Sequence, residues 1–317
     1  MRIFRHLDNL PVFHNLVLTI GTFDGVHCGH QQIIRRVNQL AGSLQGESML
    51  ITFHPHPRNV VSNEEEVKLL TPPDEKFDLL QRYGIDNVVV VPFTRAFSEQ
   101  TPQEYIGNFL VGNFAPKVIV IGYNHRFGCN RQGNIHLLRQ MGKQMGFRVE
   151  EIPKQLVDDL SVSSTKIRHA LLSGNVTTAQ LLLGHAYFVR GIVVKGNQMG
   201  TQIGFPTANI MIEDASKLIP DNGVYAVRVQ LRGNTFKGML NIGHRPTFNG
   251  ETKTIEVHIF NFSDNIYGEL LQIDFIALVR REQKFASPDA LMQQLKADKQ
   301  TVLQILANAG ETPQLFT

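Results

Sequence analysis

The chain has 317 residues, of which 42% are hydrophobic and 19% charged, and its formal net charge is +3 at pH 7. This length exceeds that of a typical single domain, so we expect a globular protein of two domains. The small positive excess does not indicate a nucleic-acid-binding surface, so nucleic acid is not an expected partner.

Cysteine content and apolar patterning exclude several further classes of protein. The two cysteines, Cys28 and Cys129, are too few for a disulfide framework. Cys28 lies beside two histidines, but the spacing is not that of a zinc site and no second ligand pair follows. No apolar run approaches the roughly 20 residues of a membrane span, and residues 1–9 lack the apolar segment of a secretory signal. We therefore expect a cytoplasmic protein with no membrane partner.

The first half of the chain alternates short apolar runs with helical patterns. Such alternation predicts a Rossmann-like, doubly wound parallel sheet. In these sheets ligands bind outside the carboxyl ends of the strands. The runs predicted to be strands are Leu16–Ile20, Met49–Phe53, Val88–Val91, Val118–Ile121 and, more weakly, Phe147–Ile152.

The first predicted strand runs directly into the stretch Gly21-Thr22-Phe23-Asp24-Gly25-Val26-His27-Cys28-Gly29-His30, which then opens a helix. A glycine-rich turn at a helix start presents backbone N–H groups and the positive helix end to an anion. His27 and His30 add two imidazoles, and Gly29 between them allows close approach of a ligand. The arrangement suits a polyphosphate, although by itself it could also be an ordinary loop beside two histidines.

Helix signals and polar loops follow the next strands. Thr71-Pro72-Pro73-Asp74 predicts a helix start with a cap residue, Gly84 is a plausible stop, and Thr101–Glu104 has the pattern of a capping box. Phe53–Arg58 holds two prolines, so it is an extended loop, read alone as stiff with two solvated histidines. Gly122–Gly128 suits a ring- or phosphate-binding loop or a surface turn.

A second anion site is predicted where Ser163-Ser164-Thr165-Lys166-Ile167-Arg168 opens a helix. The serines are good helix caps, which alone would explain them. Hydroxyl groups, backbone N–H groups and two cationic side chains at one helix start also make a phosphate cradle. Two such cradles on one sheet are much harder to explain by chance than either alone.

In the second half, short alternating or apolar runs separated by Gly and Asn turns replace the alternation of helices and strands. This pattern predicts a small antiparallel β-barrel closed by a C-terminal helix. Arg232-Gly233-Asn234 is a hairpin signal, and the closing helix is predicted to begin at Ser287-Pro288-Asp289. We place the domain boundary at 184/185, giving domains 1–184 and 185–317. The predicted strands are Phe188–Lys195, Val224–Leu231, Phe236–Ile242, Thr254–Phe260 and Leu271–Val279.

Two patterns in this half place polar side chains together on one side of an extended segment. In Gly204-Phe205-Pro206-Thr207-Ala208-Asn209, the alternation of an extended segment puts Thr207 and Asn209 on the same side, where two oxygens could complete the shell of a magnesium ion carried by ATP. Read alone, this could be an edge strand facing water. In Thr254–Phe260, alternation puts Glu256 and His258 on the face opposite the apolar residues, so Glu256 alone would be a solvated carboxylate.

These motifs together resemble the bacterial bifunctional riboflavin kinase/FAD synthetases, which belong to the HxGH nucleotidyltransferase superfamily. The resemblance extends from Leu16 to about Leu306. It implies that the N-terminal domain adenylylates FMN with ATP to give FAD and pyrophosphate, and that the barrel phosphorylates riboflavin with Mg-ATP to give FMN. Riboflavin, FMN, FAD and ATP are then the expected ligands of a monomer or weak homo-oligomer.

The resemblance also implies roles for individual residues. In the first domain His27 and His30 are catalytic; ATP contacts are Gly21, Phe23, Asp24, Gly25, Gly29, Ser163, Ser164, Thr165 and Arg168; and FMN contacts are His54, Pro55, His56, Pro57, Asn124 and Arg126. In the second domain Glu256 is the general base, ATP contacts are Gly196, Gly200, Gly204, Thr207 and Asn209, and Thr207 and Asn209 bind Mg²⁺. Asn124 and His125 replace an acidic and an aromatic residue of the family pattern, and Thr201 replaces an arginine.

Two alternatives from other classes remain at this point. An HxGH motif also occurs in class I aminoacyl-tRNA synthetases, but their second motif differs from Ser163–Arg168 and no basic face is apparent. A flavin-binding regulator could keep the fold without turnover, and the departures at Asn124 and Thr201 would be compatible with it.

Overall fold

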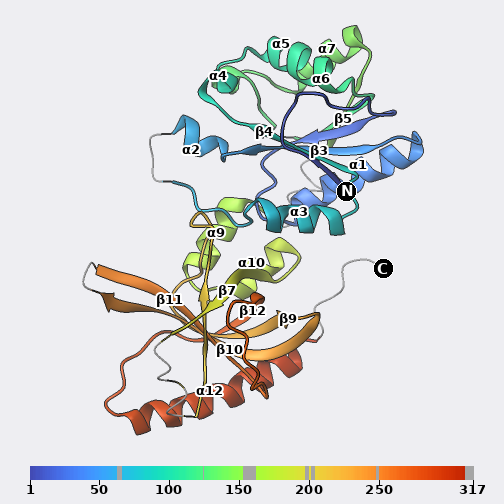
Figure 1. Cartoon of the computed structure of the whole chain (residues 1–317). Helices are drawn as coiled ribbons and strands as arrows, with labels where there is room; N and C mark the ends of the chain where they lie inside the picture. The colour runs from blue at the N-terminus through green and yellow to red at the C-terminus, as the bar shows by residue number, and fades with distance from the viewer. Residues whose placement is uncertain are drawn as a thin grey trace. The chain divides into compact units, whose positions relative to one another are not determined.

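The computed structural model divides into two compact units, Met1–Ser164 and Thr165–Thr317, which we call the N-terminal and C-terminal units (Figure 1). It describes residues 1–62, 66–123, 125–152, 162–196, 200, 204–247 and 250–310. Compactness alone does not assign activities to residues, so the boundary at 184/185 stays a prediction about function.

The N-terminal unit is built on a fully parallel sheet in the order β1-β4-β3-β2-β5-β6. All five predicted strands are confirmed, and the short edge strand β1 was not expected. The strand order reverses at β2, which pairs with β3 on one side and β5 on the other, so the ligand crevice of such a sheet lies at the carboxyl end of β2. The strands are β1 Arg2–Phe4, β2 Val17–Ile20, β3 Ser48–His54, β4 Asn87–Pro92, β5 Val118–Gly122 and β6 Arg148–Ile152.

Helices cover both faces of this sheet. Figure 1 shows α1 and α3 on one face and α4 to α7 on the other. The sheet contributes fully buried residues such as Leu18, Ile51 and Ile119 to the core, where they pack with Phe109 and Leu138. The helices are α1 Cys28–Ser43, α2 Pro57–Val61, α3 Pro73–Arg82, α4 Arg95–Ser98, α5 Pro102–Glu104, the π-helix η1 Tyr105–Val111, α6 Gly112–Phe114, the 3₁₀ turn η2 Cys129–Arg131 and α7 Ile135–Met145.

One predicted helix start differs from the structure in its cap. The capping box is confirmed, because Thr101 and Glu104 bond reciprocally to each other's backbone N–H. At α3, however, the cap position is occupied by Pro72 with no side-chain cap, so the expectation of a Thr71 cap was wrong. The Thr71 hydroxyl instead accepts a hydrogen bond of 2.9 Å from the N–H of Gly25. A residue type typical of caps is here used to bind a turn from elsewhere in the chain.

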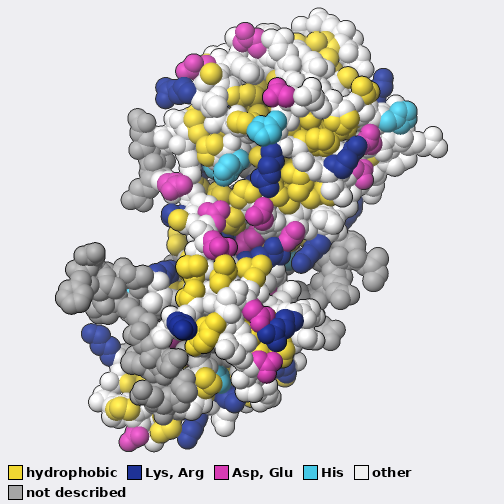
Figure 2. All heavy atoms as spheres, viewed as in Figure 1, with side chains coloured by type: hydrophobic (Ala, Val, Ile, Leu, Met, Phe, Trp, Pro, Cys, Tyr) yellow, Lys and Arg dark blue, Asp and Glu magenta, His cyan; other side chains and the backbone are white. Residues whose placement is uncertain are grey.

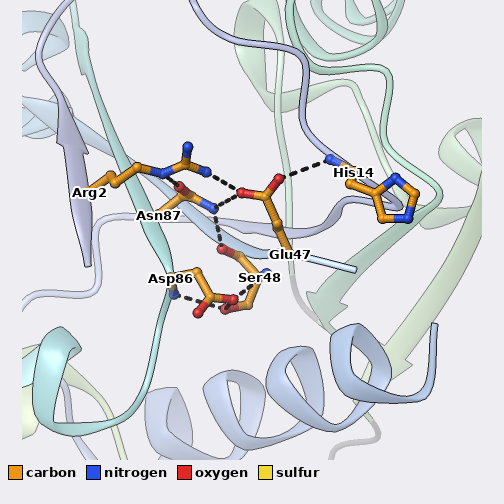
Figure 3. Close-up of polar contacts among 6 residues, drawn as sticks. All are labelled: Arg2, His14, Glu47, Ser48, Asp86 and Asn87. Atoms are coloured by element: carbon orange, nitrogen blue, oxygen red, sulfur yellow. Dashed lines mark hydrogen bonds and ion pairs between the residues drawn. The ribbon is translucent and has the colours of Figure 1, made fainter. Parts of the chain in front are cut away.

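A polar network fastens the amino-terminal edge of the sheet (Figure 3). Arg2 of β1 bonds the Asn87 side chain of β4 at 2.9 Å and pairs with Glu47, and Asn87 reaches the carbonyl oxygen of Ser48 at 3.1 Å. Asp86 accepts bonds from both the N–H and the hydroxyl of Ser48. These contacts connect β1, β3 and β4 at the edge opposite to their carboxyl ends.

The C-terminal unit is a closed barrel in the order β10-β11-β8-β7-β12-β9 with antiparallel pairing, as predicted. The strand β8 was not among the predicted strands, although an edge strand was one interpretation of the segment that leads into it, and β10 and β11 are longer than their apolar runs. The elements are α9 Ser164–Leu172, α10 Val176–Leu183, β7 Tyr187–Val194, β8 Ala208–Met211, β9 Gly223–Leu231, β10 Asn234–Thr247, β11 Gly250–Ile259, β12 Leu270–Arg280 and α12 Pro288–Asn308.

The closing helix α12 packs on the outside of this barrel. It begins where predicted, with the Ser287 hydroxyl accepting a bond of 3.2 Å from the N–H of Ala290. Its buried residues Val302 and Leu306 pack with Ala226 of β9 and Met239 of β10.

Candidate functional sites

The first candidate site is the turn between β2 and α1, at the point where the strand order reverses. His27 caps α1, its Nδ1 accepting a bond of 3.3 Å from the N–H of His30. The two imidazole rings stack with centroids 3.6 Å apart and an interplanar angle of 14°. The sequence therefore places both histidines at a helix start, where backbone N–H groups and the helix dipole favour a bound anion.

His30 is held in its uncharged form. Its Nδ1 is buried and has no hydrogen-bond partner among the residues that the structure describes. Burial, followed by the neighbouring charges of His27 and Lys76, lowers the pKa of His30 well below its ordinary value. At neutral pH the ring is thus a neutral imidazole, which offers a hydrogen bond to a ligand without carrying a charge.

Asp24 shapes this turn from inside. Its side chain is 1% exposed, and the carboxylate accepts bonds from the N–H groups of Leu70 at 3.1 Å and Thr71 at 3.0 Å. The backbone around it is strained, with positive φ angles of 46° at Phe23 and 41° at Val26, conformations that β-branched and bulky residues seldom adopt. The structure shows that Asp24 holds the turn to residues 70 and 71 through these hydrogen bonds. A role in binding ATP stays a prediction for Gly21, Phe23, Asp24, Gly25 and Gly29.

Ser164, the first residue of α9 and the last residue of the N-terminal unit, lies beside this turn. The Ser164 hydroxyl donates a bond of 3.0 Å to the carbonyl oxygen of Asp24, across 140 positions of sequence. Ser164 of the second predicted phosphate cradle is therefore in direct contact with the first cradle. Ser163 precedes the helix, and Thr165 and Arg168 continue it; their roles stay predictions.

The two loops predicted to bind FMN flank the turn. β2 lies between β3, which ends at His54, and β5, which ends at Gly122, so their loops emerge at the same edge of the sheet. His54, Pro55 and Arg126 are exposed, whereas His56 and Pro57 are half-buried at the start of α2, where His56 caps the helix by accepting a bond of 3.2 Å from the N–H of Arg58. Asn124 lies outside the described residues.

An aromatic cluster behind these loops was not predicted. Tyr105 stacks on Phe127 with centroids 5.1 Å apart, and Phe97 contacts Phe53, Tyr105 and Phe109 at 5.0–6.0 Å. His125 packs against Phe127 at 5.9 Å, and burial together with Arg131 lowers the pKa of His125 to about 4. The signal in the sequence is the density of aromatic residues between β4 and β5.

The second candidate site is built from paired strands of the barrel. Glu256 of β11 lies directly opposite Asn209 of β8, and the Thr207 hydroxyl donates a bond of 3.1 Å to the Glu256 carboxylate. A Cβ atom at Gly196 would overlap the side-chain amide of Asn209, and one at Gly200 would overlap the carbonyl oxygen of Phe205. The structure thus brings together the glycines, the two oxygen ligands and the carboxylate predicted from three separate motifs. Gly204 has a φ of 79°, which favours glycine there.

His258 supports the segment that carries Thr207. Its ring Nδ1 lies 2.7 Å from the carbonyl oxygen of Pro206, and the ring contacts Phe205 and Phe260 edge-on at 5.3 and 5.5 Å. A carbonyl partner requires Nδ1 to carry the proton, so His258 donates this bond. The residue therefore fixes the loop just before the proposed metal ligands.

The donors of the second site suit a hard divalent cation. A hydroxyl, an amide oxygen and a carboxylate are the oxygen ligands that Mg²⁺ prefers. Within the described ranges, no group of three or more His, Cys, Asp and Glu side chains could hold a metal by itself. Such a set fits an ion that arrives with the phosphates of a nucleotide.

Charged side chains of both signs are interspersed on the face of the molecule seen in Figure 2. In the part of the chain that the structure describes, no helix combines the length and apolar character needed to span a bilayer.

Comparison with known proteins identifies the family. The FAD synthetase family model matches residues 11–166, and the riboflavin kinase family model matches residues 183–306. The bifunctional riboflavin kinase/FMN adenylyltransferase of Haemophilus influenzae is 39% identical over 303 residues, which are 95% of this chain and 98% of that protein. The protein of the same name from Listeria monocytogenes is 38% identical, covering 90% and 91% of the two chains.

A solved structure shows the same fold along the chain. A Streptococcus pneumoniae protein described as a macrolide-efflux protein aligns with a TM-score of 0.88 at 31% identity, over 95% of this chain and 98% of that one. With two family models in the expected order and full-length relatives, the chain belongs to the family of bifunctional riboflavin kinase/FMN adenylyltransferases.

Proposed function

We propose that this chain makes FAD from riboflavin in two steps, with a separate site for each. The barrel transfers the γ-phosphoryl group of Mg-ATP to riboflavin, giving FMN. The site after β2 then transfers AMP from a second ATP to FMN, giving FAD and pyrophosphate. The adenylyltransferase site is best supported by the contact of Ser164 with the histidine turn, because this contact joins two motifs far apart in sequence within the N-terminal unit. The kinase site is best supported by the pairing of Glu256 with Asn209 and by the hydrogen bond from Thr207 to Glu256.

In the kinase site Glu256 acts as general base. The hydroxyl of riboflavin must lose a proton as it attacks phosphorus, and a carboxylate in hydrogen-bond reach can accept it. Thr207 and Asn209 would hold Mg²⁺, which neutralises phosphate charge when bound. Gly196, Gly200 and Gly204 let the backbone approach the triphosphate closely. Thr201, which lies outside the described residues, stands where the family pattern has an arginine, and a threonine carries no positive charge.

The adenylyltransferase site needs no strong base. A phosphate monoester has its second pKa near 6, so FMN is already largely dianionic at neutral pH. The requirement is alignment and stabilisation of the charge that grows at the α-phosphorus. We expect His27, His30, the N–H groups at the start of α1 and Ser164 to meet this need, and the family resemblance adds Thr165 and Arg168. The His54–Pro57 segment, with Asn124 and Arg126, binds FMN.

We place the enzyme in the cytoplasm, as a monomer or weak homo-oligomer, with neither nucleic acid nor membrane as partner. Both cysteines are free thiols, which suits a reducing compartment.

Incubation of the purified chain with riboflavin and Mg-ATP, followed by chromatography of the flavins, tests the proposal. We expect FMN to form first, then FAD together with pyrophosphate. A folded protein that forms neither product would instead be a flavin-binding protein without turnover.

A further inference from the structure

We propose that Lys76 is a positioning residue of the adenylyltransferase site, whose buried ammonium group anchors the histidine turn through the carbonyl oxygen of Thr22. The inference rests on the proposed function of that site. Lys76 belongs to none of the motifs discussed above, and it reaches the site from the second turn of α3.

The ammonium group anchors the turn through one carbonyl. Nζ of Lys76 donates a bond of 2.8 Å to the carbonyl oxygen of Thr22 and a longer one of 3.5 Å to the Thr52 hydroxyl. That hydroxyl itself donates to the same Thr22 carbonyl at 3.1 Å. The ends of β2 and β3 and the helix α3 are thus joined at a single oxygen inside the histidine turn.

Burial of a lysine at this point calls for a physical reason. Lys76 is only 7% exposed, and both hydrogen bonds go to uncharged oxygens. Burial lowers the pKa of Lys76, and the charge of Asp24 acts in the opposite direction. Lysines are seldom fully buried unless paired, and an apolar side chain would fill the same space without desolvating a charge. A function for the charge itself accounts for its presence.

The charge acts on His30. The groups that affect protonation of His30 are the stacked His27 and Lys76, and both add to the effect of burial in lowering the pKa of His30. Asp24 lies on the same turn and influences Lys76. Lys76 thus adds to burial and to His27 in favouring the neutral ring of His30, which can donate one N–H toward a developing phosphate charge.

Lys76 also connects the turn with the FMN loop. It lines a cavity of about 10 Å³ together with His54 and His56 of that loop and Thr52 and Phe77. This volume accommodates about one water molecule. A substitution at Lys76 would therefore affect both the histidine turn and the loop proposed to bind FMN.

The test compares three variants with the full-length enzyme. Lys76→Met removes the charge and both hydrogen bonds, Lys76→Gln keeps a donor without the charge, and Lys143→Met makes the same change at an exposed position of α7. For each protein, kcat and KM of the FMN adenylylation step are measured from pH 5.5 to 9. Riboflavin phosphorylation by the same sample serves as an internal control, and circular dichroism reports whether the protein is folded.

For Lys76→Met we expect kcat of FAD formation to fall by about 10-fold to 100-fold. Removal of a positive neighbour raises the pKa of His30, so the acid limb of the pH profile should move to higher pH. Lys76→Gln should show the same shift with a smaller loss of kcat. Riboflavin phosphorylation should not change, and Lys143→Met should match wild type in both reactions.

The inference is overturned if folded Lys76→Met keeps the wild-type kcat and acid limb. If Lys76→Met does not fold, Lys76→Gln decides, and a wild-type acid limb in that variant overturns the electrostatic role. Failure of the proposed function looks different, because the wild-type enzyme itself would then form no FAD from FMN and ATP.

Discussion

The two sites use carboxylates in opposite ways. In the N-terminal unit Asp24 points inward and accepts backbone N–H groups, whereas in the barrel Glu256 lies on an outward face and accepts the Thr207 hydroxyl. This difference matches the proton demands of the two proposed reactions. An alcohol nucleophile needs a base, whereas a phosphate dianion needs only a place to align and an environment that stabilises negative charge.

The backbones differ as well. The histidine turn obtains its shape from strained residues with positive φ and from ties to α3 and α9. The kinase site obtains its shape from strand register and from glycines that leave room for neighbouring side chains. Single substitutions should therefore separate the two activities.

Glu256→Gln should give the largest effect, because it removes the proposed base while keeping the size and a hydrogen-bonding group. We expect riboflavin phosphorylation to slow by about 10²-fold to 10⁴-fold. Adenylylation of supplied FMN should stay at the wild-type rate. A Glu256→Gln enzyme that phosphorylates riboflavin normally would remove this residue from the mechanism.

His30→Ala should act on the other reaction. Loss of the neutral donor at the helix start should slow FAD formation by about 10²-fold to 10³-fold, the range known for removal of one donor to a developing oxyanion. Phosphorylation of riboflavin should be unaffected. If this variant were folded and had lost both activities, the two sites would not be independent.

Gly196→Ala should have an intermediate effect. The added Cβ would overlap the side-chain amide of Asn209, so the amide must shift away from the position expected for a metal ligand. We expect kcat/KM for ATP in the kinase reaction to fall by about 10-fold. Gly42→Ala is a suitable control, because a Cβ there meets nothing within 4 Å.

Asp24→Asn should mainly affect stability. The amide cannot accept the bonds from both Leu70 and Thr71 as a carboxylate does, and hydrogen bonds to charged groups contribute about 1.5–3 kcal/mol each. We expect the free energy of unfolding of the N-terminal unit to fall by about 2 kcal/mol, measured by denaturant titration. Asp74→Asn, at an exposed ion pair on α3, should change it by no more than about 1 kcal/mol.

His125→Phe should give the smallest effect, visible only as a dependence on pH. The folded protein holds the pKa of His125 at about 4, against an ordinary value near 6.5, so between these values the unfolded chain binds the extra proton. Stability is therefore lost as pH falls through this window. Unfolding at pH 7.5 and 5.0 should show a loss smaller by about 1–2 kcal/mol in the variant, and an equal loss would mean that His125 is protonated in the folded state.

Most strands were predictable because buried strands of a parallel sheet are continuous apolar runs. The exceptions were two short strands that form because they pair with neighbouring strands, and not because their own sequences are strongly apolar. Arg2–Phe4 forms β1 through pairing with β4 and the network around Asn87, and Ala208–Met211 forms β8 through pairing with β7 and β11. Tertiary context decides such short strands.

Sequence motifs predicted the residues of both candidate sites, but they could not predict which of these residues contact one another. The register of Glu256 with Asn209 follows from barrel closure, and the contact of Ser164 with Asp24 spans 140 positions. Thr71 had the local chemistry of a cap, yet a turn 46 residues earlier uses its hydroxyl. Lys76 carries no signal in a single sequence, because only the fold shows that this lysine is buried beside the histidine turn.

A complementation experiment tests the existence of two independent sites most directly. His30→Ala and Glu256→Gln enzymes are incubated, separately and mixed, with riboflavin and Mg-ATP, and FMN and FAD are quantified. We predict FMN alone from His30→Ala, almost no product from Glu256→Gln, and FAD from the mixture. If the mixture forms no FAD although Glu256→Gln still adenylylates supplied FMN, the account of two separable sites that share a freely exchanging intermediate is contradicted.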